Sequence, residues 1–285
     1  MAKGNLLLGT AKNSVGDVVM YRREGAQISR VRVRNVKNPK TDAQSFQRAI
    51  MAPIAKFYSP LSVVLERSFE GLSKAKSHNK FNQVNANLAR KNKWALPKGT
   101  GFFPLPYQLS QGTLPTVSYA APVDNIYFSL GVAHTGTANA TIGDLSKDFI
   151  AAGFKDGDIV SIILVRKNEE TNTYFPVSTQ FAIDSTSTAA IATLSLPKLT
   201  FGYDADNSWN FMDSGDALIA GAVIVARFDG TMWRRSTQTL AVDTALMGTV
   251  TADAAVAAAI ASYGQTAGDG NPLVYLDGDE LADGE

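Results

Sequence analysis

The stretch ALIAGAVIVARFDGTMWRRSTQTLA, residues 217–241, decides the fold class of this chain. It opens with an apolar run, Ala217–Arg227, rich in the β-branched residues that favour strands. Asp229-Gly230 then precedes a second run, Thr231–Ala241, and this dipeptide between two such runs is the strongest short-range signal for a hairpin. We therefore predict an antiparallel β-hairpin at this position.

Similar short runs precede this hairpin and predict a β-rich region over residues 116–241. With the two runs of the hairpin, the predicted strands are Asn125–Val132, Ala138–Ile142, Ile159–Arg166, Tyr174–Ile183, Ala189–Leu196, Ala217–Arg227 and Thr231–Ala241. Seven short strands separated by turn residues are typical of an antiparallel, immunoglobulin-like β-sandwich. The Cys…Trp…Cys pattern of true immunoglobulin domains is missing, so the sequence predicts the architecture alone.

The region before the sandwich predicts a hairpin followed by helices, which makes the whole chain α+β. In residues 1–40, Val18–Arg22 and Gln27–Arg34 are the predicted strands of a hairpin that follows a leading arm. Residues 41–94 show helical spacing, with a capping-box signature at Thr41 and Gln44.

Prolines divide this helical region. We expect a kink or break near Pro53 and a new helix at Ser59-Pro60, because proline removes a helical hydrogen bond. That second helix should end at Gly71, and a third helix should begin after Ser77.

Two further segments complete the predicted organisation. Residues 95–115 form a linker in which aromatic residues alternate with prolines, as in a strap packed on a surface. Residues 242–285 comprise an alanine-rich helix over 251–263 and an acidic tail. Val274–Leu276 in this tail has the composition of one short edge strand.

The charge is divided between the two parts of the chain. Residues 1–100 hold 19 basic and 5 acidic residues, a net charge of +14, whereas residues 101–285 hold 8 basic and 21 acidic residues, a net charge of −13. A basic segment attracts polyanions, and an acidic one covers a basic neighbour. The split therefore predicts contact with nucleic acid or between copies of the chain.

The composition excludes several classes of site. The chain has no cysteine, so disulfides, thiolate metal sites and cysteine nucleophiles are ruled out. No apolar stretch is long enough for a signal peptide or a membrane span. We expect a protein that is cytoplasmic on synthesis, binds no small-molecule substrate and uses no cofactor.

Residues that commonly carry chemistry are few. The two histidines, His78 and His134, have no partner at metal-ligand spacing, and surface or capping roles fit them better. Two acidic clusters have the residue types of a calcium site without the spacing of a calcium-binding loop: Asp204, Asp206 and Asn207, and Asp277, Asp279 and Asp283. No nucleotide-binding or nucleophile motif is present, so we expect no enzyme and no metal centre.

The best local feature is a basic ribbon in the N-terminal block. Seven cations lie within 19 positions: Arg22, Arg23, Arg30, Arg32, Arg34, Lys37 and Lys40. Strand alternation places Arg30, Arg32 and Arg34 of the last predicted strand on one face, about 7 Å apart. Such a ribbon contacts nucleic-acid phosphates, meets an acidic surface of another subunit, or protects a strand edge from aggregation.

Three motifs in this block resemble an uncharacterised family of Bacteroidota and their gut phages. They are GDVVMYR at residues 16–22, RVR at 30–32 and NPKTDAQ at 38–44, the last followed by Gln47-Arg48. The resemblance covers residues 1–95 and implies a bacterial or phage origin, but no activity. It marks Thr41, Gln44, Gln47 and Arg48 as the joint between the hairpin arm and the first helix.

These observations favour a structural protein that self-assembles, such as a component of a phage virion. Its basic N-terminal part would meet the acidic β domain of another copy or other virion proteins. A nucleic-acid-binding protein that uses the ribbon is the alternative. A surface adhesin is a third reading, against which the missing signal peptide argues.

Overall fold

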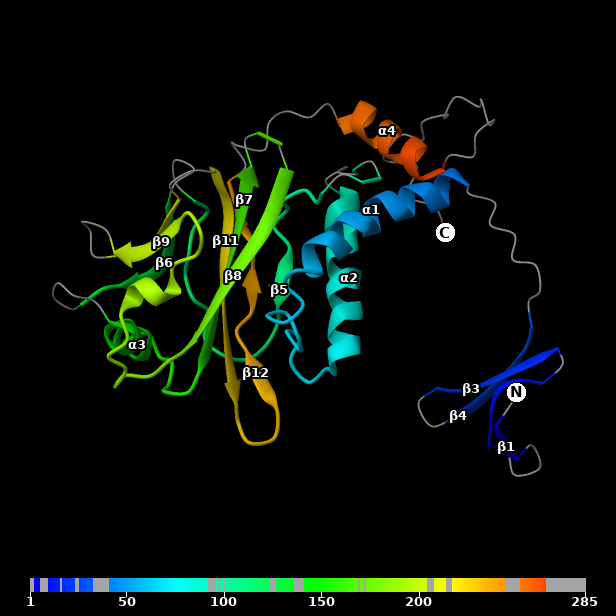
Figure 1. Ribbon diagram of the computed structural model, residues 1–285, viewed down its shortest axis with the longest axis horizontal. Helices are drawn as coiled ribbons and strands as arrows, with labels where there is room; N and C mark the ends of the chain where they lie inside the picture. Colours follow the sequence, from blue (N-terminus) through cyan, green and yellow to red (C-terminus); the bar gives the residue numbers. More distant parts are fainter. Residues whose placement is uncertain are drawn as a thin grey trace. The chain divides into compact units, whose positions relative to one another are not determined.

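The computed structural model divides the chain into two compact units, Met1–Lys40 and Thr41–Glu285 (Figure 1). The structure describes residues 3–5, 10–15, 17–23, 26–32, 41–91, 96, 98–99, 101–122, 127–135, 141–168, 170–171, 173–203, 208–213, 217–243 and 252–264. Each unit is described by itself.

The first unit is an antiparallel sheet of four strands in chain order. The strands are β1 (Lys3–Asn5), β2 (Thr10–Val15), β3 (Val18–Arg23) and β4 (Ala26–Val31). β3 and β4 form the hairpin that the alternation predicts, and the leading arm supplies two more strands. The last predicted strand residues, 33–34, lie outside the described residues.

The second unit begins with two helices, α1 (Asp42–Tyr58) and α2 (Lys74–Lys91). α1 continues through Pro53, since the buried residues Ile50, Ile54 and Phe57 hold both halves of the helix in the core. The predicted helix from Ser59 to Gly71 is wrong, because residues 59–67 form turns. Leu61, Val64 and Leu65 are buried in this turn conformation, which ends at Arg67 with a left-handed φ of 54°.

The rest of the second unit is mostly antiparallel sheet. Its elements are β5 (Gln108–Ser110), β6 (Tyr127–Ala133), α3 (Ile142–Ala151), β7 (Ile159–Asn168), β8 (Thr173–Ala182), the 3-10 helix η2 (Ile191–Leu194), β9 (Leu199–Tyr203), β10 (Ser208–Asp213), β11 (Ala217–Phe228), β12 (Trp233–Arg235), β13 (Gln238–Thr239), β14 (Ala241–Val242) and α4 (Ala252–Gly264). A five-stranded sheet has the order β12-β11-β7-β8 with β14 also on β11, and a three-stranded sheet has the order β6-β10-β9. The fold is therefore α+β, as the sequence predicts.

One predicted strand of the second unit is wrong, and four of its elements escape the sequence pattern: β5, α3, β9 and β10. Residues 189–196 contain η2 instead of a strand, because a short apolar run does not distinguish helix from strand. Most of the predicted strand 138–142 lies outside the described residues, and its last residue, Ile142, opens α3 behind a capping box of Thr141 and Asp144. This box marks α3 in the sequence, whereas β9 and β10 carry no comparable signal.

Both faces of the five-stranded sheet are buried. In β7, Val160 and Ile162 join the core beneath the three-stranded sheet and α3, whereas Ile163 and Val165 join the core that contains α1 and α2. The helices α1 and α2 thus lie on one side of the five-stranded sheet, and the three-stranded sheet lies on the other with α3 (Figure 1).

The predicted linker is part of the helical core. Phe102, Phe103, Leu105 and Tyr107 are all buried there, and the Tyr107 ring lies 4.8 Å from the ring of Phe57. Burial raises the pKa of the Tyr107 hydroxyl, which donates a hydrogen bond to the Phe103 carbonyl at 2.9 Å. The strap is therefore a structural layer that joins helices and sheet in one compact unit.

Candidate interaction surface

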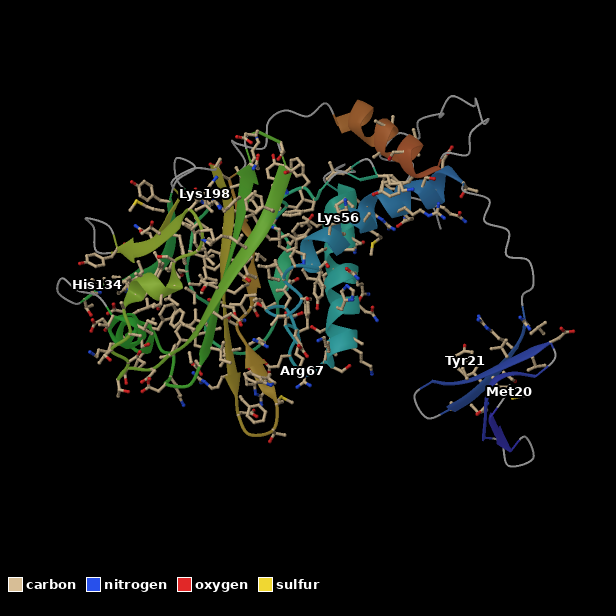
Figure 2. The ribbon with its side chains drawn as sticks, in the orientation of Figure 1. Met20, Tyr21, Lys56, Arg67, His134 and Lys198 are labelled. Carbon is tan, nitrogen blue, oxygen red and sulfur yellow. The ribbon has the colours of Figure 1, made fainter. Side chains whose placement is uncertain are left out.

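The predicted basic ribbon lies on β3 and β4 of the first unit. Arg30 and Arg32 are exposed, and the Arg30 guanidinium carbon lies 5.8 Å from the centre of the Tyr21 ring. A guanidinium over an aromatic face is a cation–π contact. Figure 2 labels Tyr21 and its neighbour Met20 on this sheet.

The register of β3 and β4 distinguishes two faces, because directly paired residues of an antiparallel ladder lie on the same face. One face, the cationic face, carries the pairs Val19–Arg30 and Tyr21–Ile28. The other face carries the pairs Val18–Val31 and Met20–Ser29, and the register places Arg22–Gln27 on it as well. The sheet therefore presents a cationic face with one aromatic ring and a second face of mixed apolar and polar pairs.

None of the first-unit side chains whose burial is described, those of residues 17–21 and 26–32, is buried. Val31 is 73% exposed and Tyr21 is 38% exposed. A sheet of this size needs a covered hydrophobic face for stability, and a unit of about 40 residues usually needs a disulfide, a metal or oligomerisation. Because the chain has no cysteine, no disulfide can stabilise the first unit.

The other predicted contact residues are only partly described. Arg22 pairs with Gln27 and Arg23 with Ala26 in the backbone register, while Arg34, Lys37 and Lys40 lie outside the described residues. The structure thus brings the described arginines together on one hairpin, as the alternation predicts.

The four residues of the predicted joint divide between two roles. Thr41 is the N-cap of α1 and its hydroxyl accepts the backbone N–H of Gln44 at 3.4 Å. Gln47 instead links α1 to α2, since its side-chain oxygen accepts a hydrogen bond from Arg90 at 2.6 Å. Arg48 lies half-buried in α1. These contacts start and anchor the first helix.

Much of the acidic charge of the β-rich part is used inside the second unit. Seven aspartates accept side-chain or backbone hydrogen bonds there: Asp144, Asp148, Asp156, Asp158, Asp184, Asp213 and Asp229. Asp158 and Asp213 are almost fully buried, in ion pairs with Arg227 at 2.6 Å and Arg166 at 2.7 Å. The net charge of −13 therefore overstates the negative surface that this part offers to a partner.

Both histidines lie within the packing of the second unit. The His134 side chain is 1% exposed and its Nδ1 lies 3.2 Å from the carboxylate of Asp148, which also accepts the indole N–H of Trp209 at 2.8 Å. Burial of this pair keeps it away from any substrate in solvent. His78 stacks on Tyr58 with ring centres 4.3 Å apart.

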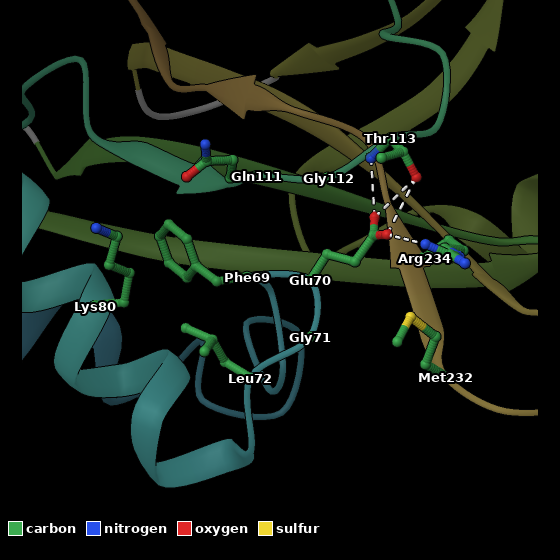
Figure 3. A pocket seen from close by; sticks show the side chains of 10 residues that line it. All are labelled: Phe69, Glu70, Gly71, Leu72, Lys80, Gln111, Gly112, Thr113, Met232 and Arg234. Atoms are coloured by element: carbon green, nitrogen blue, oxygen red, sulfur yellow. Dashed lines mark hydrogen bonds and ion pairs between the residues drawn. The ribbon is translucent and has the colours of Figure 1, made fainter.

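A pocket of about 520 Å³ lies where α2, the strap and β12 meet (Figure 3). It is lined by Phe69, Glu70, Gly71, Leu72, Lys80, Gln111, Gly112, Thr113, Met232 and Arg234. The Glu70 carboxylate accepts the backbone N–H of Thr113 at 2.9 Å and a hydrogen bond from Arg234. Burial raises the pKa of Glu70, but the bonds from Arg234 and Thr113 outweigh it and lower the pKa.

The ionised Glu70 carboxylate therefore links the turn region that follows α1 to β12. The sequence carries no signal for it, because its partners lie 43 and 164 positions away.

Metal and membrane sites are limited to what the described residues show. Within the described ranges, no group of three or more histidines and carboxylates has the arrangement of a metal site. Both acidic clusters considered for calcium, at residues 204–207 and 277–283, lie outside these ranges. No helix among the same residues has the length and hydropathy to cross a membrane.

Residues 9–125 match the model of a family of unknown function, DUF6266. The match includes β2–β4, both long helices and the strap, and it ends before β6. No curated protein and no solved structure matches the chain. The block with the basic sheet is thus similar to an uncharacterised family, for which no activity is assigned.

Proposed function

We propose that the chain is a non-enzymatic structural protein that self-associates. The basic N-terminal unit of one copy would contact the acidic remainder of another. The observation that carries this proposal is the exposure of the sheet β1–β4. Tyr21 and Val31 are exposed, and none of the side chains whose burial is described in this sheet is buried. A partner that covers this sheet would bury the exposed side chains of its described residues, and a small sheet needs such a covered face for stability. Opposite charges steer the encounter and set its orientation.

A phage virion is the setting that we propose for this assembly. The resemblance of residues 1–95 to a family of Bacteroidota and their gut phages supports that setting. An immunoglobulin-like sandwich belongs to the same proposal. The three-stranded and five-stranded sheets enclose one common core, which supports a sandwich, whereas the helices cover the outer face of the larger sheet.

The experiment measures the molar mass of the full chain by light scattering at low and high salt. We expect oligomers at low salt that dissociate as salt screens the charges. The double variant Arg30→Glu/Arg32→Glu should be monomeric. Lys147→Glu/Lys155→Glu, a matched charge reversal on the second unit, should assemble like the unmodified chain. A chain that stays monomeric at low salt and high concentration contradicts the proposal.

A nucleic-acid-binding role is the second candidate, favoured by the Arg30–Tyr21 contact. An aromatic ring beside a cation offers a stacking platform and a phosphate contact together. Filter binding of the full chain to single- and double-stranded DNA should then show an affinity that falls steeply with salt. The variant Tyr21→Ala should weaken binding to single strands in particular. Undetectable binding at every salt concentration removes this candidate.

A further inference from the structure

We propose that the acidic C-terminal tail of a second copy, residues 265–285, docks along β4 of the N-terminal sheet. This inference rests on the proposed self-association and names the segment that performs it. The tail of another chain would add beside the edge strand β4, which carries Arg30 and is followed directly by Arg32.

Charge complementarity favours the tail over the folded β-rich part. Residues 1–40 hold 9 basic and 2 acidic residues, a net charge of +7. Residues 265–285 hold 6 acidic residues and no Lys or Arg, a net charge of −6. The aspartates of the folded part make internal hydrogen bonds, and two of them, Asp158 and Asp213, are almost fully buried. The tail therefore gathers six negative charges, with no basic residue between them, in 21 positions of the sequence.

The position of β4 favours addition of a strand. Among the described strands, β4 is the last in the order β1-β2-β3-β4, with β3 on one side. A peptide that adds to such an edge gains main-chain hydrogen bonds, and alternate side chains confer specificity. The tail contains one segment with strand composition, Val274–Leu276, which Asp277 and Asp279 follow closely.

Residues 28–32 of the sheet and residues 275–279 of the tail place complementary side chains in the same order along one face. Ile28 and Arg30 of β4 lie on the cationic face, and the same alternation extends to Arg32, the next residue after the strand. In an added strand, Tyr275, Asp277 and Asp279 alternate in the same way, so parallel addition aligns the aromatic ring with the isoleucine and both carboxylates with the arginines. Val274 and Leu276 then lie on the opposite face, which carries the exposed Val31.

A complementation experiment tests the proposal on full chains. One variant ends at Gly264, and the other carries Arg30→Glu/Arg32→Glu. We expect each variant alone to lose association at least tenfold relative to the unmodified chain. Their mixture should associate, because the charge-reversed chain retains the tail and the truncated chain retains the sheet. A truncated chain that assembles like the unmodified chain overturns the tail proposal and leaves self-association intact, whereas an unmodified chain that stays monomeric refutes the proposed function itself.

Cross-linking tests the register. The chain has no cysteine, so Ser29→Cys in one population and Leu276→Cys in another supply the only thiols. Mixed under oxidising conditions, these chains should form a covalent heterodimer that high salt suppresses at least fivefold. Lys155→Cys replaces Ser29→Cys in the control. Equal yields from both mixtures contradict docking on a second copy. So does a disulfide between the cysteines introduced at positions 29 and 276 that forms only when one chain carries both substitutions.

Discussion

Arg166 and Asp213 form a two-point ion pair that joins the two sheets of the second unit. Arg166 lies on β7 of the five-stranded sheet and Asp213 on β10 of the three-stranded sheet. Their Nε–Oδ2 and Nη2–Oδ1 distances are 2.7 and 2.9 Å, and the side chains are 5% and 0% exposed. The guanidinium also donates to the Pro197 carbonyl at 3.2 Å, which leaves the charge well satisfied in the interior.

Replacement of Asp213 by Asn should lower the free energy of unfolding by about 3–5 kcal/mol, because it leaves a buried guanidinium without its counter-charge. Urea unfolding measures this loss. Lys147→Gln removes the exposed contact of Lys147 with Asp144 and should cost less than about 1 kcal/mol. If both variants lose the same small amount, the interior pair does not join the sheets as described.

Phe57→Ala should destabilise helices and sheet together. Phe57 is fully buried, and its ring centre lies 5.1 Å from that of Phe102 and 4.8 Å from that of Tyr107. The free energy of unfolding should therefore fall by about 3–5 kcal/mol. Circular dichroism follows the helices, and the fluorescence of Trp209 in a Trp94→Phe/Trp233→Phe background follows the other core.

Both signals should shift to the same lower denaturant concentration, since residues 41–285 form one compact unit. Val63→Ala, at a position 75% exposed, is the control. Separate midpoints for the two signals would contradict a single cooperative unit.

Gly221→Ala should destabilise the unit by about 1–3 kcal/mol through overpacking. A methyl group at Gly221 of β11 would lie 2.4 Å from the ring of Phe128 on β6, where the two sheets meet. Gly202→Ala is the matched control within β9, because nothing lies within 4 Å of the added carbon. Thermal unfolding of both variants measures the difference, and an unchanged midpoint for Gly221→Ala would be evidence against this close approach of the sheets.

Asp229 should titrate far below an ordinary aspartate. Hydrogen bonds from the backbone N–H groups of Met232 and Thr231, then from the Arg234 side chain, lower its pKa from 3.8 to about 2. A depressed pKa stabilises the fold above the unfolded value, and this contribution is lost as the pH falls from about 4 through about 2.

Carboxyl chemical shifts followed by NMR against pH measure this midpoint. Asp229→Asn should flatten the dependence of stability on pH in this window. A midpoint near 4 in the folded chain would mean that the turn bonds do not favour the ionised form.

Local chemistry made part of the fold readable from the sequence. Asp229-Gly230 and the alternation around Arg30 predicted hairpins that the structure contains, because turn geometry and period-two alternation depend on neighbouring residues. The capping box at Thr141 was equally local and would have located α3. The residues of the candidate surface were readable for the same reason, since the described arginines lie on one hairpin.

The sequence by itself determined the charge split, the α+β class and the basic hairpin, since each depends on composition or on residues a few positions apart. Only the tertiary structure decided that both faces of β7 are buried and that Asp158 and Asp213 form ion pairs with arginines inside the second unit. It also decided that, in the first unit, none of the side chains whose burial is described is buried. Burial and ion pairing join residues far apart along the chain, and such contacts leave no periodic or local pattern in the sequence.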